Sequence, residues 1–278
     1  MSRRKHKGAD RTGTLIIIGG REDREKDMVI LREFCRYLKS NSKVVVATMA
    51  STVGHELWEI YREAFRRLGV KRISHLDVVD RRQPSDQQAL KAMEGADAVF
   101  FTGGDQLKIT SELGGTEVLD RIFELYQQGG VIAGTSAGAS VMSETMLVGS
   151  YSDSLPRLTQ ALNMTPGLGL IKRIIIDQHF AERGRITRLI GAVARNPAFL
   201  GVGIDEDTAV VMENQETLRV LGRGSVYIID ATETRETEIS ETELGKPFSI
   251  FNLRIHVLSE GDLYDVRMKE PRRPDVTH

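Results

Sequence analysis

The stretch Gly130-Val131-Ile132-Ala133-Gly134-Thr135-Ser136-Ala137-Gly138, residues 130–138, decides how the rest of the sequence is interpreted. Residues 130–133 form a short apolar run that is typical of a buried strand, and residues 137–142 have a helical pattern. A Gly-x-Ser-x-Gly motif lies between the two. This order predicts a nucleophile elbow, a sharp turn that lifts the hydroxyl of Ser136 out of a sheet. The alternative is an ordinary tight turn in which Ser136 only caps the helix.

The sequence around the elbow repeats the alternation of short apolar runs and longer helical patterns. The further short runs, most of them rich in β-branched residues, lie at residues 15–18, 44–47, 70–74, 97–101 and 173–177. They predict an α/β fold in which a mostly parallel sheet is sandwiched between helices. After Phe199, strand-like segments follow one another without helices, so we expect extra C-terminal β-strands, as an antiparallel extension of the same sheet or as a small packed sheet. We expect one domain over residues 13–278, after a disordered basic tail at residues 1–12.

The composition limits the classes of protein to which the chain can belong. Its 278 residues include 38 Lys and Arg against 39 Asp and Glu, which gives a formal charge of −1. Balanced charge argues against a nucleic-acid binder, because that role usually needs a basic field. The apolar runs are far shorter than the ~18 residues of a membrane span, and the basic start lacks the apolar stretch of a signal peptide. With Cys35 as the single cysteine, we expect a cytoplasmic protein without membrane or nucleic-acid partners.

An activated serine needs a general base, and His179 is the strongest candidate among the six histidines. It comes just after the predicted strand at 173–177, at the carboxyl edge where open α/β sheets place their ligands. Ser136 is expected to emerge at that same edge, so the two side chains can meet. The alternative is a purely structural histidine at the end of a strand.

The base in turn needs a carboxylate that fixes its tautomer. Glu206 follows the predicted strand at 199–202 and should lie at the same edge as His179. Its neighbours Asp205 and Asp207 stay open as alternatives. The resulting order of serine, histidine and glutamate differs from that of the α/β-hydrolases, which indicates a different fold with convergent chemistry.

Two glycine pairs also follow predicted strands. Gly103-Gly104 could offer a backbone N–H to an oxyanion, as could the amide of Ala137, or the pair could form an ordinary turn that ends its strand. Gly19-Gly20 follows the first strand, but the full G-x-G-x-x-G pattern is absent. A dinucleotide-binding loop is therefore disfavoured there.

The segment Glu-Arg-Gly-Arg-Ile-Thr-Arg at residues 182–188 places three arginines in the first turns of a predicted helix. Positive charge there opposes the helix dipole, at a cost of roughly a few tenths of a kcal/mol each, which an anionic group could offset. Arg185 and Arg188 share a helix face and could present bidentate donors to carboxylates. A solvated helix face is the alternative.

Together these motifs resemble those of the cyanophycinases over nearly the whole chain. The resemblance rests on Gly103-Gly104-Asp105-Gln106, Gly134-Thr135-Ser136-Ala137-Gly138-Ala139, Asp177-Gln178-His179-Phe180 with Arg183, Arg185 and Arg188, and Gly203-Ile204-Asp205-Glu206-Asp207-Thr208. It implies a flavodoxin-like fold similar to that of class I glutamine amidotransferases, with Ser136 as nucleophile, His179 as base and Glu206 as orienting acid. It also implies an oxyanion hole formed by Gly104 and Ala137. The residues implied to bind substrate are Gln106, Asp177, Gln178, Arg183, Arg185 and Arg188.

Cyanophycinases are serine exopeptidases related to aspartyl dipeptidases. They cleave cyanophycin, a poly-aspartate that bears an arginine on each side-chain carboxyl, and release β-Asp-Arg dipeptides. The resemblance implies this activity on cyanophycin or β-Asp-Arg peptides, a homodimer, and no metal or organic cofactor. The arginine cluster could clamp a substrate carboxylate, whereas a substrate guanidinium would need an acid such as Asp177. An aspartyl or isoaspartyl dipeptidase on the same scaffold, or a binding protein with an inactive elbow, is the alternative.

Overall fold

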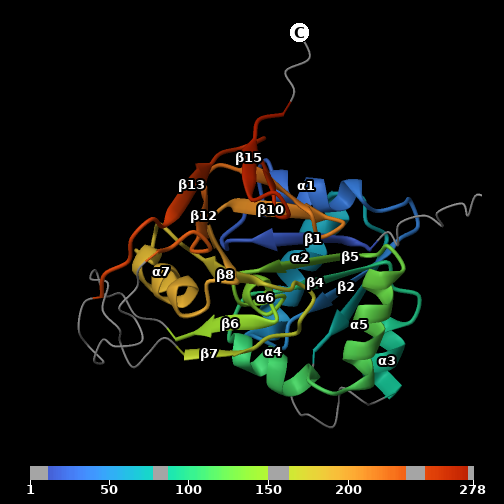
Figure 1. Ribbon diagram of the computed structural model, residues 1–278. Helices are drawn as coiled ribbons and strands as arrows, with labels where there is room; N and C mark the ends of the chain where they lie inside the picture. Colours follow the sequence, from blue (N-terminus) through green and yellow to red (C-terminus); the bar gives the residue numbers. More distant parts are fainter. Residues whose placement is uncertain (1–11, 78–86, 150–162, 236–247, 275–278) are drawn as a thin grey trace, which may run out of the picture.

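A nine-stranded sheet forms the centre of the computed structural model, which describes residues 12–77, 87–149, 163–235 and 248–274 (Figure 1). Five neighbouring strands run parallel, in the spatial order β1 (Thr14–Ile18), β5 (Val131–Thr135), β4 (Ala98–Phe101), β2 (Lys43–Ala47) and β3 (Arg72–Leu76). On the other side of β1 the sheet continues antiparallel through β10 (Thr208–Glu213), β11 (Thr217–Gly222), β14 (Leu263–Asp265) and β15 (Glu270–Arg272). C-terminal strands therefore do extend the sheet.

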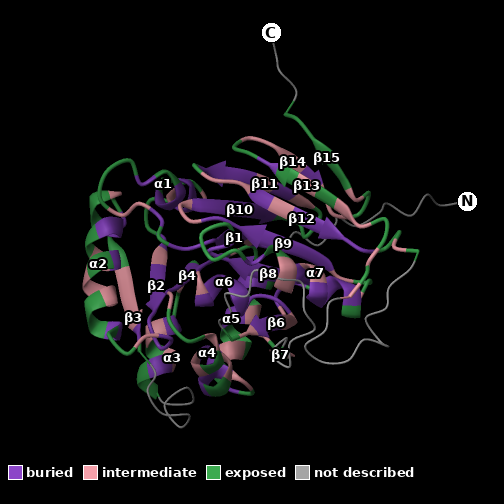
Figure 2. Cartoon of the chain, turned by 90° about the vertical axis from the view of Figure 1, so that its left-hand side faces the viewer, coloured by how far each residue is buried: buried purple, intermediate pink, exposed green. Residues whose placement is uncertain are grey.

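Helices cover both faces of the parallel strands. Successive strand residues point to opposite faces, and because both sets of side chains are apolar, both faces need to be covered. One face carries α1 (Val29–Arg36) and α2 (Gly54–Arg67), and the other carries α3 (Gln87–Met93), α4 (Gln106–Leu113) and α5 (Glu117–Gln127). Ile16 of β1 is buried in one cluster with Phe34 and Phe65. Its neighbour Ile17 is buried in the other cluster with Ile122. This double cover explains the continuous apolar runs of the sequence, and Figure 2 shows the central strands as buried.

A second sheet of four strands lies beside the first, in the order β13 (Arg254–Leu258), β12 (Val226–Asp230), β9 (Leu200–Ile204) and β8 (Ile174–Gln178) (Figure 1). The helix α7 (Ile186–Arg195) packs on it so closely that a Cβ on Gly201 would lie 2.9 Å from Val193. The strand predicted at 173–177 belongs to this sheet, where it pairs parallel with β9, and not to the principal one. Both alternatives for the C-terminal strands are thus realised.

The remaining elements are short. α6 (Ala137–Ser140) follows β5, and β6 (Thr145–Val148) pairs antiparallel with β7 (Asn163–Pro166). Within the described ranges, no helix has the length and apolarity needed to cross a bilayer. The predicted tail at 1–12 lies outside the described residues except for its last residue. The single domain stays a prediction.

Candidate active site

The predicted elbow is present as a sharp turn between β5 and α6. Ser136 has φ 53° and ψ −111°, a conformation that costs about 1–3 kcal/mol for a residue with a side chain. Its amide donates to the carbonyl of Ile18 at 3.0 Å, so β1 holds the turn. A Cβ on Gly134 would lie 2.2 Å from the carbonyl oxygen of Gly138, and one on Gly138 would lie 2.5 Å from that of Phe101. Both glycines of the motif are therefore required by close backbone approach.

Three of the predicted residues are joined in one line of hydrogen bonds. The Oγ of Ser136 lies 2.8 Å from Nε2 of His179, and Nδ1 of that histidine lies 2.7 Å from Oε1 of Glu206. The His179 side chain is 7% exposed and the Glu206 side chain 18%. A carboxylate at Nδ1 fixes the proton on that nitrogen, which leaves Nε2 free to accept the serine proton.

The neighbours of Glu206, which the sequence left open, have other partners. Asp205 accepts hydrogen bonds from the amides of Ala181 at 2.9 Å and Ser225 at 3.0 Å. Asp207 accepts one from the amide of Asp23 at 2.9 Å. The two aspartates therefore fix loops around the site, whereas Glu206 is the carboxylate in contact with the imidazole.

Burial lowers the pKa of His179 below its ordinary value of 6.5. The hydrogen bond to Glu206 opposes this effect, and the positive charges of Arg183 and Arg185 add to it. A lowered pKa keeps the imidazole neutral at neutral pH. His179 is therefore in the state that can accept a proton.

The loop after β1 supplies contacts to the site that the sequence did not predict. The carbonyl of Gly19 accepts from the amide of His179 at 2.8 Å, and the carbonyl of Gly20 accepts from the amide of Asp207 at 2.8 Å. Gly20 has φ 113°, and a Cβ there would lie 2.3 Å from Cε1 of His179. Arg21 donates to Oε2 of Glu206 at 3.3 Å. In the sequence, the glycine pair after the first strand was the signal for this loop. The pair does not indicate which residues the loop contacts, because those residues are distant in the sequence.

The two predicted oxyanion residues, Gly104 and Ala137, each adjoin a residue that lies at the elbow. Ala137 is the first residue of α6, and amides at this position have no acceptor within their own helix. Gly104 has φ 145°, and a Cβ there would lie 2.2 Å from the carbonyl oxygen of Ala50. The adjacent Gly103 lies beside the elbow, since its Cβ would be 3.5 Å from the Cβ of Ser136. Both amides belong to segments that border the nucleophile.

The predicted arginine cluster has an anionic partner within this chain. Arg188 contacts Asp177 with two nitrogens, one of them at 2.6 Å, and Arg185 lies 3.1 Å from the same carboxylate. Asp177 is fully buried and Arg185 is 4% exposed. Burial lowers the pKa of Arg185 to about 10, so its guanidinium stays charged at neutral pH. The expected direct contact between Asp177 and a substrate guanidinium has no support here, because that carboxylate has no exposed surface.

The helix that carries this cluster begins later than the sequence indicated. α7 starts at Ile186 with Arg185 as its N-cap, and Gly184 before it has φ 58°. Arg183 thus lies in a turn before the helix, where it is exposed. Within the described part of the chain, its guanidinium has no ion-pair partner, unlike those of Arg185 and Arg188.

The two predicted glutamines contact neighbouring parts of the site. The amide nitrogen of Gln106 donates to the carbonyl of Leu147 in β6. Gln178 is 6% exposed; it donates to Oγ of Ser140 at 3.3 Å and accepts from Arg185. Gln178 therefore joins α6 to the arginine cluster, and Gln106 joins α4 to β6.

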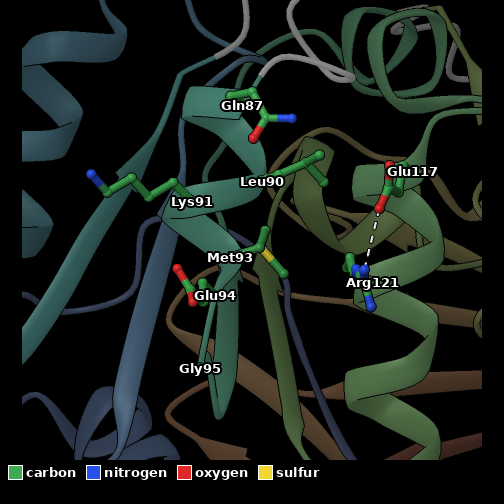
Figure 3. Close-up of a pocket in the computed structure, with 8 residues that line it drawn as sticks. All are labelled: Gln87, Leu90, Lys91, Met93, Glu94, Gly95, Glu117 and Arg121. Carbon is green, nitrogen blue, oxygen red and sulfur yellow. Dashed lines mark hydrogen bonds and ion pairs between the residues drawn. The ribbon is translucent and has the colours of Figure 1, made fainter.

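A separate hollow of about 590 Å³ lies between α3 and α5 (Figure 3). Its lining side chains include Lys91 and Glu94, and Arg121 forms an ion pair with Glu117 at 3.2 Å. None of the residues that line it belongs to the predicted site. The described residues contain no group of three metal-ligating side chains.

The serine hydroxyl lies on an elbow in an α/β fold and is hydrogen-bonded to a buried neutral imidazole, which is hydrogen-bonded in turn to a carboxylate. This arrangement defines a serine hydrolase site. Residues 15–220 match the sequence pattern of peptidase family S51. The chain belongs to peptidase family S51 and is a serine-type peptidase.

The chain is similar to several cyanophycinases along most of its length. The cyanophycinase of Synechococcus elongatus is 36% identical over 269 residues, which cover 96% of this chain and 83% of that protein. The cyanophycinase of Trichormus variabilis is 39% identical over 252 residues, which cover 90% of this chain and 84% of that protein.

Two solved structures share the fold. A peptidase from an acI-B1 actinobacterium has a TM-score of 0.66 at 23% identity, covering 92% of this chain and 98% of that chain. A putative peptidase E from Listeria monocytogenes has a TM-score of 0.53 at 19% identity, covering 77% of this chain and 100% of that chain. These likenesses confirm the predicted fold class.

Proposed function

We propose that this peptidase is a cyanophycinase, a serine exopeptidase that hydrolyses cyanophycin to β-Asp-Arg dipeptides. The observation that carries the proposal is the hydrogen-bonded line of Ser136, His179 and Glu206 in a chain similar to named cyanophycinases. The proposal includes a homodimer in the cytoplasm, without metal or organic cofactor.

The reaction begins with attack of the Ser136 Oγ on the scissile carbonyl carbon. The hydroxyl proton passes to Nε2 of His179 across the 2.8 Å contact, and Glu206 stabilises the imidazolium that forms. The amides of Gly104 and Ala137 bind the oxyanion. His179 then protonates the leaving amine, and the acyl-enzyme remains. A water molecule, deprotonated by the same histidine, hydrolyses that ester and regenerates the serine.

Arg183 is the arginine that we assign to direct substrate contact. It is exposed, its charge acts on His179, and it has no ion-pair partner among the described residues. The scissile bond lies in the aspartate backbone, so the aspartate at the carboxyl end of the polymer has a free α-carboxylate beside that bond, and a guanidinium fork can bind this group with two parallel hydrogen bonds. Arg185 and Arg188 both form ion pairs with the buried Asp177, and we assign them a structural role in the site. Gln106 and Gln178 lie at its border and complete the set proposed to act on substrate.

The test is incubation of the purified protein with cyanophycin, followed by mass spectrometry of the soluble products. We expect β-Asp-Arg dipeptides, and a loss of about 10⁴-fold or more for Ser136→Ala, which should fold because a small side chain already fits the elbow. Hydrolysis of short α-aspartyl peptides alone would identify a dipeptidase instead. Binding of the polymer without any product would identify a binding protein.

A further inference from the structure

We propose that Glu22 is a positioning residue that holds the nucleophile elbow through the side chain of Thr135. The inference rests on the proposed role of Ser136 as nucleophile. Glu22 is 2% exposed, and one of its carboxylate oxygens accepts a hydrogen bond from Oγ1 of Thr135 at 2.6 Å. The other oxygen accepts from the hydroxyl of Tyr61. Thr135 and Glu22 are 113 residues apart in the sequence, so only the fold brings them together.

The contact acts on the residue immediately before the nucleophile. Thr135 is the last residue of β5 and is 4% exposed. Its backbone pairs with Ile18 at the end of β1, whose carbonyl also accepts the amide of Ser136 at 3.0 Å. A threonine side chain is stiff about its first torsion, so a hydrogen bond that fixes Oγ1 also fixes the direction of the backbone at this position. Glu22 thereby limits the directions in which the Ser136 hydroxyl can point.

The loop that carries Glu22 contacts His179, Glu206 and Thr135, the residue that precedes Ser136. Gly19 accepts from the amide of His179, and Arg21 contacts Glu206. Glu22 completes the set with Thr135, next to the nucleophile. A loop that holds the base and the acid therefore holds the nucleophile as well.

The charge of Glu22 explains why this contact is strong. A buried carboxylate is costly unless it is hydrogen-bonded, and two hydroxyl donors here offset that cost. Burial and the nearby Glu22 charge raise the pKa of Tyr61, so its hydroxyl keeps its proton and donates. Hydrogen bonds to a charged acceptor are worth more than those between neutral groups, which makes the Thr135 contact a firm one.

The two hydroxyl partners provide a matched pair of variants. Thr135→Val removes the hydroxyl beside the nucleophile while it keeps the shape of the side chain. Tyr61→Phe removes the other donor to the same carboxylate, on α2, away from the elbow. Thr135→Ser keeps the hydroxyl and serves as the conservative variant. The measurement is the rate at which a fluorophosphonate reagent labels Ser136, together with kcat, KM and the melting temperature.

We expect Thr135→Val and Glu22→Gln to be labelled about 10- to 100-fold more slowly than the native protein, the scale of a misplaced reacting group. Their kcat should fall while KM stays nearly constant. Tyr61→Phe should melt at a lower temperature but be labelled at the native rate, and Thr135→Ser should recover most of the rate. These results together would separate a positioning role from one in stability alone.

Native labelling rates for folded Thr135→Val and Glu22→Gln would overturn the inference and leave Glu22 as a support of the core. If Glu22→Gln does not fold, the comparison of Thr135→Val with Thr135→Ser still decides. Labelling of Ser136→Ala at the native rate would refute the proposed nucleophile itself. The two failures therefore have different signatures.

Discussion

Replacing Arg185 by glutamine should lower the melting temperature, whereas the same replacement of Arg183 should slow catalysis and leave stability almost unchanged. Arg185 is 4% exposed and bonds to a carboxylate on Asp177 that is fully buried. Arg183 is exposed and lies in a turn. The two arginines are two residues apart, but their surroundings give them different roles.

The magnitudes follow from these surroundings. Removing one partner of a buried ion pair costs about 3–5 kcal/mol. Because Arg188 still contacts Asp177 with two nitrogens, we expect the lower end, about 3 kcal/mol for Arg185→Gln. At about 2–4 °C per kcal/mol for a chain of this size class, the melting temperature should fall by about 6–12 °C. Arg183→Gln should change stability by no more than about 0.5 kcal/mol. Loss of a charged hydrogen bond to substrate, about 1.5–3 kcal/mol, should lower its kcat/KM by about 10- to 150-fold.

Thermal unfolding and hydrolysis of β-Asp-Arg oligomers, measured on both variants, test this division. Arg183→Lys should restore only part of kcat/KM, because an ammonium group cannot reproduce the planar fork of a guanidinium. Unchanged kcat/KM in Arg183→Gln would refute direct substrate contact. An unchanged melting temperature in Arg185→Gln would refute the supporting role of the buried ion pair.

Three further predictions concern His179. Since burial lowers the pKa of His179, the acid limb of kcat/KM should lie at a lower pH than an ordinary imidazole would give, because the protonated imidazole cannot accept the serine proton. Removing the positive charge with Arg183→Gln should shift that acid limb to higher pH, and an unshifted limb would show that Arg183 does not act on the base. Gly20→Ala should abolish most hydrolysis of cyanophycin, because the new Cβ would lie 2.3 Å from the imidazole at a φ of 113°; native activity in this variant would contradict the packing described here.

The sequence predicted strands well where burial on both faces left only apolar residues. The runs at 15–18, 44–47 and 97–101 match β1, β2 and β4 to within one residue at either end. The run at 70–74 is displaced from β3 by two residues. Its first residue, Val70, is buried but donates its amide to the carbonyl of Phe65 in the turn, so it is apolar without being in the ladder. Burial therefore predicts a strand only where the backbone bonds also join the sheet.

The same limit applied to the arginine cluster. The charges and spacing of the arginines indicate that they need an anionic partner. That partner, Asp177, lies eight residues before Arg185, across a turn in which His179 and Gly184 have positive φ. Helical spacing gives no information about such a turn. The contact between Glu22 and Thr135 could not be predicted either, because Thr135 occupies an unspecified position of the Gly-x-Ser-x-Gly motif, Glu22 belongs to none of the motifs, and 113 residues separate the two.

The geometry of the site depends on how the two sheets meet. Ser136 is at the end of a strand of the large sheet, whereas His179 follows β8 of the small one. The link between them is made by the loop after β1, whose Gly19 carbonyl accepts the amide of His179. Ser136, His179 and Asp207 all have positive φ, and such conformations persist only where the surrounding structure fixes them. The carbonyls of Gly19 and Gly20 accept the amides of His179 and Asp207 and supply that constraint, so the loop after β1 helps to set the 2.8 Å distance across which the proton moves.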